Sequence, residues 1–447
     1  MSATAPVAVL GAGIAGLVAG RELARRDLPV KVYEAGPHVA GLAASHRDDD
    51  GFSFDTGAHF ITNRLAAALG VSERCSVVRT YGESVWLDGR AVPYPTGLLL
   101  NKRYLASATS QRLRRPRSPA VTARDHFERT YGRALAHDVA IPLVEAWSGA
   151  PADHLSAAVA DKIPTGLAET VWLHSAKRVS RRAVAIGYCG EAPQTSAVFH
   201  VYPDDGVGGM CQSIADSLGN RVELESPVER IYVEDGRAVG VRVNGVDSDA
   251  SAVITTAPVH VLPRLVTGTQ ALDHLGRFTY RPMIVVNLKL NGRGLLPDVV
   301  TWRPSGPVFF RATEGPVSMP QLAPAGKTMI SCDIGAEVGD HNWAADDDAL
   351  AQSCLDGLQD MIPDVHDRYL GHRVIRIRLA YPRFLLDHEQ DRLRWAHGTG
   401  IDGLVSIGRN GEFAHSLMED VYWRTIRRVG QLATWLTEVD GTTRADD

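Results

Sequence analysis

The feature that most constrains this chain is a glycine-rich hexapeptide near its N-terminus. The apolar run Val7–Leu10 contains β-forming residues, and the sequence GAGIAG, residues 11–16, follows it directly. A helical pattern of apolar residues comes next, and residues 31–34 are typical of a second strand. A β-α-β arrangement of about 30 residues predicts a Rossmann-like, dinucleotide-binding unit within an α/β fold.

Each glycine of the hexapeptide has its own role in such a unit. Gly11 allows a tight turn, Gly13 lets the backbone approach a pyrophosphate, and Gly16 allows the helix to pack closely on the strand. Ile14 and Ala15 stand at the predicted helix N-terminus, where unpaired N–H groups and the helix dipole favour phosphate oxygens. A strand before the hexapeptide and a helix after it favour cofactor binding over a chance match.

A carboxylate stands where it could bind a ribose. Glu34 closes the second predicted strand 18 residues after Gly16 and is followed by Ala35. Its oxygens can accept hydrogen bonds from ribose hydroxyls and disfavour a 2′-phosphate. Small residues continue through residues 36–45, which include Gly41 and Leu42. This composition suits a backbone that runs close under an extended cofactor.

A third segment favours FAD over NAD as the cofactor. Residues 51–60 form a predicted strand that ends in the small residues Gly57 and Ala58, followed by His59. A nicotinamide-binding domain has no need for such a segment, so we expect these three residues beside the flavin. His59 is the candidate catalytic residue, although a lone histidine is more often a core or surface group.

The ordered set of motifs resembles a superfamily of flavoproteins that includes amine oxidases, protoporphyrinogen oxidases, carotenoid-desaturase-like enzymes and UDP-galactopyranose mutases. The matching pieces are GAGIAGLVAGREL, VYEAGPHVAGLAAS, FDTGAHFITN and residues 199–210, 227–231 and 403–420. Together they span nearly the whole chain. The resemblance implies bound FAD, with Val228 among its contacts, and it identifies no substrate.

Two positions depart from the pattern of the oxidases. Many of them have two glycines and an arginine where this chain has residues 40–42, Ala-Gly-Leu. Amine oxidases usually carry Gly-Asp where this chain has Gly408-Arg409, which looks more like UDP-galactopyranose mutase. We expect Arg409 to bind the cofactor phosphate or ribityl region. We expect Leu417 and Met418, at the start of a helix, to bring backbone donors to the flavin ring.

The resemblance also implies two domains. The FAD-binding domain is expected to combine residues 1–96, 195–260 and 395–447. The substrate domain is expected to combine residues 97–194 and 261–394, a mixed sheet with a helical insertion. In the substrate domain, Arg311 is a candidate for binding an anionic group of the substrate, and Tyr381 is expected near the substrate.

Charge and cysteine usage argue against several other classes of protein. The formal net charge of −5 gives no overall attraction to nucleic acid, and the basic run 112–117 is interpreted as a solvated loop. The five cysteines are scattered singly, so neither a disulfide framework nor a metal site is expected. No apolar run approaches the ~20 residues of a membrane span. With no leader-like N-terminus, we expect a cytoplasmic protein.

The favoured function is FAD-dependent oxidation or desaturation of a small organic molecule, because a flavin can accept a hydride. Hydrolase, zinc-protease and phosphate-loop motifs are missing from the sequence. Two alternatives stay open. One is a redox-neutral isomerase of a nucleotide sugar, which Gly408-Arg409 favours. The other is a non-catalytic FAD-binding protein, since function belongs to a site and not to a fold.

Overall fold

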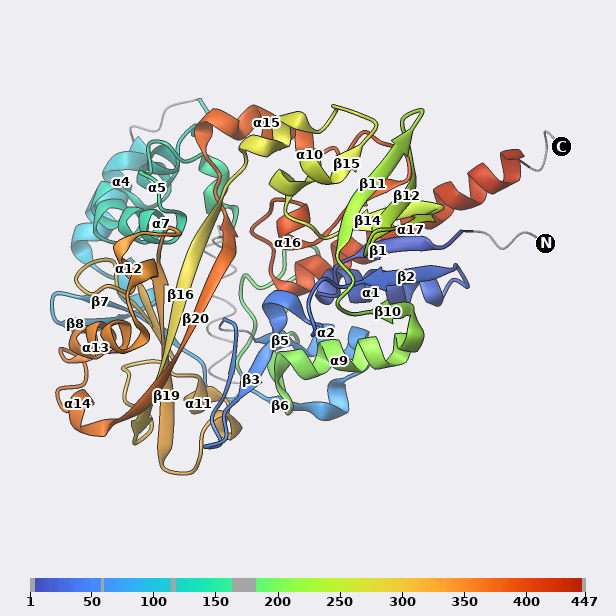
Figure 1. Ribbon diagram of the computed structural model, residues 1–447. Helices are drawn as coiled ribbons and strands as arrows, with labels where there is room; N and C mark the ends of the chain where they lie inside the picture. Colours follow the sequence, from blue (N-terminus) through green and yellow to red (C-terminus); the bar gives the residue numbers. More distant parts are fainter. Residues whose placement is uncertain (1–4, 58–59, 114–117, 163–181, 444–447) are drawn as a thin grey trace.

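The computed structural model describes residues 5–57, 60–113, 118–162 and 182–443. Figure 1 shows two large sheets, one on each side of the molecule. The first is a five-stranded parallel sheet that consists, in spatial order, of β10 (Val222–Glu223), β2 (Val30–Tyr33), β1 (Val7–Leu10), β14 (Ala252–Thr255) and β21 (Leu404–Ser406).

The predicted β-α-β unit is present at the centre of this parallel sheet. All four residues of β1 are buried, as expected for a strand covered on both faces. Helix α1 (Ile14–Ala24) packs against α9 (Gly206–Leu218) and α17 (Met418–Thr443). The α/β, Rossmann-like fold class is therefore confirmed.

The second sheet has seven strands and mixed directions. In spatial order it consists of β20 (Tyr369–Pro382), β16 (Tyr280–Asn291), β19 (Lys327–Gly335), β18 (Arg311–Thr313), β17 (Val300–Trp302), β7 (Glu83–Leu87) and β8 (Arg90–Pro93). Strand β16 pairs antiparallel with both β19 and β20. The core beside it includes apolar residues of α13 (Asp347–Leu358), which lies against this sheet (Figure 1).

Three smaller sheets complete the strands. They are β13 (Val246–Asp249), β12 (Arg237–Val243), β11 (Val228–Glu234) and β15 (Val266–Thr267); β5 (Ile61–Thr62), β9 (His200–Pro203) and β6 (Cys75–Val77); and β3 (Ser45–Arg47) with β4 (Ser53–Asp55).

The other α-helices of the described residues are α2 (Asn63–Leu69), α3 (Thr96–Leu99), α4 (Lys102–Leu113), α5 (Ala123–Tyr131), α6 (Arg133–Leu135), α7 (Ile141–Ser148), α10 (Leu262–Leu265), α11 (Gly315–Ser318), α12 (His341–Ala344), α14 (Val365–Arg368), α15 (Glu389–Trp395) and α16 (Gly408–Gly411). Within the described ranges, no helix has the length and apolar character needed to cross a membrane.

Two details differ from the sequence-based description. The basic run that begins at Arg112 is not a loop throughout, because Arg112 and Leu113 form the last turn of α4. The helical pattern of the sequence continues to that point. Strands β7 and β8 lie within the predicted segment 1–96, yet both belong to the seven-stranded sheet, where β7 pairs with β17 and β8 pairs with β7. The division into two domains stays a prediction.

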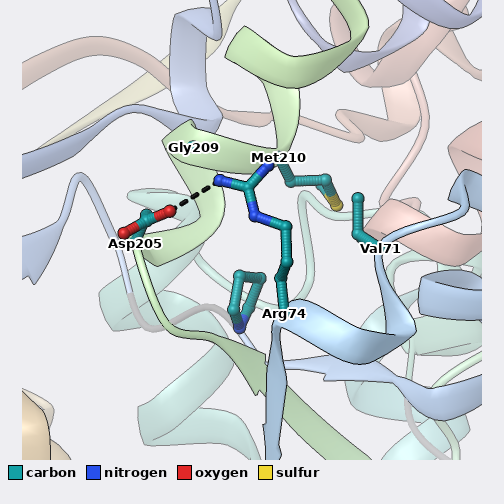
Figure 2. Close-up of a pocket in the computed structure, with 6 residues that line it drawn as sticks. Val71, Arg74, Asp205, Gly209 and Met210 are labelled. Atoms are coloured by element: carbon teal, nitrogen blue, oxygen red, sulfur yellow. Dashed lines mark hydrogen bonds and ion pairs between the residues drawn. The ribbon is translucent and has the colours of Figure 1, made fainter.

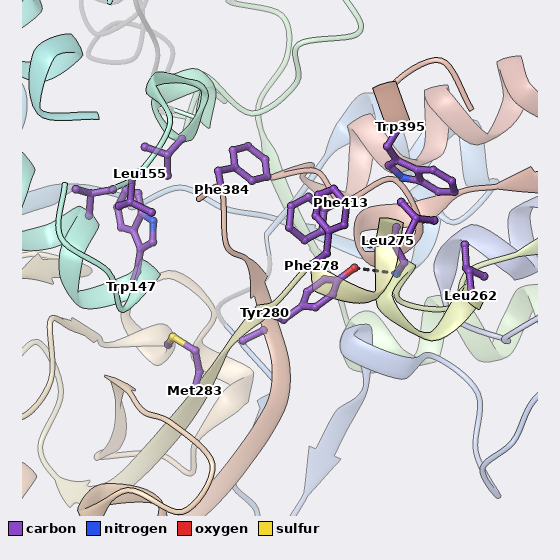
Figure 3. Close-up of a cluster of buried hydrophobic side chains, with 14 of the residues drawn as sticks. Trp147, Leu155, Leu262, Leu275, Phe278, Tyr280, Met283, Phe384, Trp395 and Phe413 are labelled. Atoms are coloured by element: carbon purple, nitrogen blue, oxygen red, sulfur yellow. Dashed lines mark hydrogen bonds between the residues drawn. The ribbon is translucent and has the colours of Figure 1, made fainter. Parts of the chain in front are cut away.

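A buried aromatic cluster joins the seven-stranded sheet to the segment around α16 (Figure 3). The Tyr280 hydroxyl donates to Asn410 O at 2.6 Å and accepts from Val259 N at 3.1 Å. The Phe413 ring meets Phe278 edge-on at 4.5 Å and Tyr280 at 5.3 Å between centroids. The seven-stranded sheet and the segment around α16 are thus fixed to each other through both packing and hydrogen bonds.

A buried glutamate fixes the far end of β18. Glu314 is fully buried, and its carboxylate accepts from the N–H groups of Gly294, Leu295 and Leu296 at 2.6–2.9 Å. It also accepts from the Thr328 hydroxyl at 2.8 Å. The loop after β16 therefore depends on an acceptor with two oxygens.

Replacing Glu314 with Gln should destabilise the fold. The amide nitrogen would face a buried backbone donor, which costs about 1–3 kcal/mol in the free energy of unfolding. Urea unfolding should show this loss, whereas Glu73→Gln, at an exposed position, should change stability by less than about 0.5 kcal/mol. Equal midpoints for the two variants would contradict the role of Glu314.

Candidate functional site

The turn between β1 and α1 is shaped by two glycines that the packing itself requires. Gly11 has a φ of +97°, and a methyl group added there would lie 2.2 Å from Thr256 Oγ1. A methyl group added at Gly16 would lie 1.9 Å from Gly11 O. Thr256 donates its hydroxyl to Leu10 O at 2.8 Å, which holds it against the turn. Neither glycine can be replaced without moving backbone.

Gly13 differs from these two residues. Its φ of −72° suits any residue, and an added methyl group would meet only Ala40 O, at 3.9 Å. The fold itself therefore does not require glycine at this position. The open space on that side of the turn, in front of the N-terminus of α1, fits a dinucleotide pyrophosphate.

Glu34 connects this turn to the end of β2. Its Oε2 accepts from Ala12 N at 2.7 Å, and its Oε1 accepts from Gly36 N at 2.9 Å. Each carboxylate oxygen has a further lone pair, so hydroxyl groups of a ribose can still be bound. The carboxylate is held in place by the backbone and is only partly exposed.

Other predicted cofactor residues converge on the same turn. Gly41 has a φ of +52°, and a methyl group added there would lie 3.7 Å from Gly13 Cα. A methyl group added at Gly408 would lie 3.0 Å from Ala15 Cβ. Ala35 is exposed, while Ile14, Leu42 and Gly57 are half-buried. Ala58 and His59 lie outside the described residues.

The predicted contact Val228 is also tied to this region. It begins β11 two residues after Ser226, whose N–H donates to the Glu34 carbonyl at 2.8 Å. The segments that carry residues 11–16, 34–42, 228 and 408 are distant in sequence and adjacent in space.

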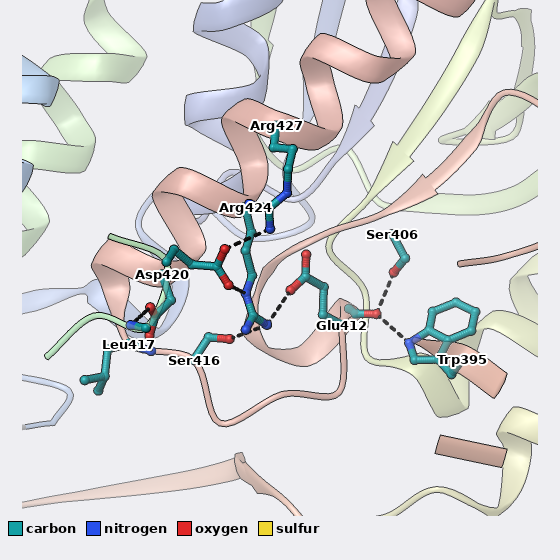
Figure 4. A network of polar contacts seen from close by, with 11 residues as sticks. Trp395, Ser406, Glu412, Ser416, Leu417, Asp420, Arg424 and Arg427 are labelled. Atoms are coloured by element: carbon teal, nitrogen blue, oxygen red, sulfur yellow. Dashed lines mark hydrogen bonds and ion pairs between the residues drawn. The ribbon is translucent and has the colours of Figure 1, made fainter. Parts of the chain in front are cut away.

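The segment before α17 is held by a network of polar contacts (Figure 4). The Leu417 N–H donates to Asp420 at 3.1 Å, so this group, expected to face the flavin, already has an acceptor. Met418 begins α17, and its N–H stays the predicted donor. Arg424 donates to Glu412 and to Ser416, each at 3.2 Å, and thereby connects the segment after α16 to α17.

Arg409 lies against a residue of the seven-stranded sheet. Its guanidinium carbon is 4.4 Å from the centroid of the Tyr381 ring, and the side chain is half-buried. Its Nε is buried and has no hydrogen-bond partner in the described part of the chain. The predicted cofactor residue Arg409 and the predicted substrate residue Tyr381 are therefore in contact.

Arg311, in contrast, already has an acidic partner. It forms an ion pair with Asp333, and the two side chains are 18% and 5% exposed. Its guanidinium carbon lies 5.4 Å from the Trp302 ring, whose Nε1 donates to Glu83 at 2.8 Å. This pairing leaves Arg311 less suited to bind an anionic substrate than its sequence position indicates.

The sequence-based reasoning assigned no role to Asp55. This carboxylate is buried below the segment that leads to residues 57–59, and it accepts hydrogen bonds from Ser45 and, at 2.9 Å, from the Tyr202 hydroxyl. Burial raises the pKa of Asp55 to about 7. Asp55 stands within the motif FDTGAHFITN, but only the fold shows which hydroxyls meet it.

A small recess lies elsewhere on the surface (Figure 2), and the Arg74–Asp205 ion pair at 2.6 Å crosses it. Its lining residues are Val71, Arg74, Pro203, Asp205, Gly209 and Met210. None of them is a predicted cofactor residue. Among the described residues, no group of three histidine, cysteine or acidic side chains is placed to hold a metal ion.

Comparison with protein families identifies the chain at the level of its family. The model of the flavin-containing amine oxidoreductases matches residues 14–422. The chain belongs to this family. It is an FAD-dependent oxidoreductase, and the glycine turn with its open side at Gly13 fits that cofactor.

Several solved structures share the fold. A reduced UDP-galactopyranose mutase has a TM-score of 0.79 at 18% identity, covering 97% of this chain and 96% of that one. A putative protoporphyrinogen oxidase from Exiguobacterium sp. 255-15 has a TM-score of 0.72 at 18% identity, covering 97% and 99%. A putrescine oxidase bound to putrescine has a TM-score of 0.65 at 14% identity, covering 97% and 99%. No curated protein matches the sequence.

Gly13 and Gly16 should respond differently to alanine. Gly13→Ala should leave the melting temperature of the FAD-free protein unchanged and weaken FAD binding, because the methyl group enters open space beside the turn. Gly16→Ala should destabilise the FAD-free protein itself. Melting curves and flavin titrations measure both effects. Normal FAD affinity in a stable Gly13→Ala protein would contradict this placement of the pyrophosphate.

Asp55 should make stability depend on pH. Its folded-state pKa of about 7 exceeds its ordinary value of 3.8. Its contribution to the free energy of unfolding is therefore fully present below pH 3.8 and is lost as the pH rises through 7. Asp55→Asn stays neutral and lacks this loss. Urea midpoints at several pH values should show the wild type losing stability relative to Asp55→Asn with rising pH. A constant difference between them would contradict a neutral Asp55.

Proposed function

We propose that this FAD-dependent oxidoreductase oxidises a small organic molecule bound between the glycine turn and the seven-stranded sheet, beside Tyr381. The stacking of Arg409 on the Tyr381 ring is the observation that carries this proposal, because it joins the cofactor-side segment to the sheet. When bound, FAD supplies an acceptor for a hydride. The residues of the chain supply orientation, exclusion of water and charge.

Two aromatic side chains, Tyr81 and Trp302, share one acidic partner, and the ring of Tyr188 packs, like that of Tyr81, against His200. The Tyr81 hydroxyl donates to Glu83 at 2.5 Å, and Trp302 donates to the other oxygen of the same carboxylate. The Tyr188 hydroxyl donates to Phe60 O at 2.8 Å. Burial, reinforced by Glu83, raises the pKa of Tyr81 well above its ordinary value, so this hydroxyl stays protonated. We propose that these neutral rings lie on the substrate side of the sheet.

The two arginines near Tyr381 differ in whether they have an acidic partner. Arg311 is balanced by Asp333, whereas no ion pair to Arg409 forms within the described ranges. We propose that Arg409 places its guanidinium against the phosphate or ribityl region of FAD, since Gly408 packs beside Ala15 at the start of α1. In this arrangement Tyr381 orients Arg409 from the substrate side.

A redox-neutral isomerase of a nucleotide sugar is the second candidate. The pair Gly408-Arg409 favours it, and one of the similar folds is that of a reduced UDP-galactopyranose mutase. The sequence identity of 18% does not extend to a shared substrate. A cytoplasmic location likewise stays a prediction from the sequence.

Anaerobic absorbance spectra with a panel of candidate substrates separate the two reactions. Oxidation of a substrate should bleach the flavin absorbance until an electron acceptor, such as oxygen, is admitted. Turnover that occurs only after prior reduction, with no net change in flavin absorbance, would instead support the isomerase. If the protein binds FAD but no compound of the panel bleaches the flavin or is converted, the result contradicts the proposed oxidation.

Arg409→Ala should weaken FAD binding. Loss of a charge-assisted hydrogen bond costs about 1–3 kcal/mol, or roughly 5- to 150-fold in the dissociation constant. Arg409→Lys keeps the charge and should fall between the two proteins, because it lacks the planar group that stacks on Tyr381. Fluorescence titration of the apoprotein measures the affinity. Arg394→Ala, at an exposed position of α15, should bind FAD normally. Equal affinities for all four proteins would reject the role of Arg409.

A further inference from the structure

One stretch of the chain has a charge pattern that the proposed chemistry does not use. Residues 97–123 contain six lysines and arginines and no aspartate or glutamate, although the whole chain has a formal net charge of −5. Most of this stretch forms α3 and α4, and α4 lies at the outer edge of the helical region in Figure 1.

The same stretch exposes large apolar side chains. Leu100, which follows α3, is 77% exposed, and in α4 Leu105 is 50% and Leu113 is 85% exposed. Single exposed leucines are common on proteins, but three within fourteen residues on a basic background are not explained by the fold.

Helix α4 separates an inner face from an outer face. Tyr104 is its buried residue, and the close approach of Gly132 to Ser107 and Ala108 holds this side against the neighbouring helices. At 100° per residue, Lys102 and Leu113 lie within about 20° of each other on the side opposite Tyr104. Leu105 and Arg112 lie on the flank of the helix, about 80–100° from Tyr104, and both are exposed. Leucines and basic groups thus share the solvent-facing side of α4.

The basic groups on this outer face are available to a partner. Lys102 and Arg112 are exposed and, in the described part of the chain, form no ion pair. Arg103 differs, because it pairs with Asp138 at 2.6 Å. The unpaired positive charges of Lys102 and Arg112 are therefore exposed together with Leu105 and Leu113 on α4.

We propose that this outer face of α4, together with Leu100, docks on an anionic lipid surface. Exposed leucines enter the boundary between headgroups and acyl chains, while neighbouring lysines and arginines attract anionic headgroups. A nucleic acid would use the positive charge but gives the three leucines no apolar region to enter. The mixture of leucines and basic residues therefore favours the membrane surface. Such docking is peripheral and needs no spanning helix.

Flotation of the purified, FAD-loaded full chain with lipid vesicles tests the proposal. The protein should bind vesicles of phosphatidylcholine and phosphatidylglycerol, bind pure phosphatidylcholine at least about tenfold more weakly, and lose affinity as salt is added. Lys102→Glu/Arg112→Glu and Leu105→Ser/Leu113→Ser should each weaken binding at least about tenfold.

A matched variant and a competing ligand complete the test. Leu393→Ser/Arg394→Glu changes an exposed leucine and an exposed arginine in α15 and should bind vesicles like the wild type. Unchanged melting temperatures and flavin spectra show that the variants remain folded. Failure of the wild type to bind anionic vesicles would overturn the proposal. So would normal binding by the leucine variant, or duplex DNA binding that depends on Lys102 and Arg112 but not on the leucines.

Discussion

The close approach of α1 to β1 is the constraint on which the rest of the site depends. With only hydrogen atoms on Gly11 and Gly16, the chain reverses direction within a few residues and directs the helix N-terminus to the edge of the parallel sheet. Glu34 then bonds to the turn through Ala12 N and fixes the end of β2 relative to it. The space beside Gly13 stays open because Gly11, Gly16 and Glu34 fix the backbone on either side of it.

The seven-stranded sheet contributes groups whose charges are largely balanced within the protein. Asp333 pairs with Arg311, and Glu83 accepts from Tyr81 and Trp302. A buried charge is costly unless it is paired or hydrogen-bonded. These contacts therefore allow charged side chains to be buried in the seven-stranded sheet. Arg409 forms no ion pair within the described residues, and its guanidinium lies over the Tyr381 ring of this sheet.

Local features of the fold could be predicted from the sequence, and long-range pairings could not. The order of strand, glycine turn and helix is encoded in adjacent residues, and the position of Glu34 follows from the length of one β-α-β unit. The Asp55 carboxylate meets the Tyr202 hydroxyl across 147 residues, and no local pattern indicates that contact. Likewise, the sequence does not show that β18 pairs with β19, which puts Arg311 opposite Asp333. Nor does it show that Asp420 accepts a hydrogen bond from the Leu417 N–H. The roles of Arg311 and Leu417 in binding stay predictions.

Release of the cofactor from the purified protein is the most direct test of the central claim that FAD binds at the glycine turn. The protein should carry flavin absorbance, and acid precipitation should leave stoichiometric FAD in the supernatant, because we expect the cofactor to be held without a covalent bond. A protein that shows no flavin absorbance after supplementation with FAD, and that binds NADH instead, would contradict the claim.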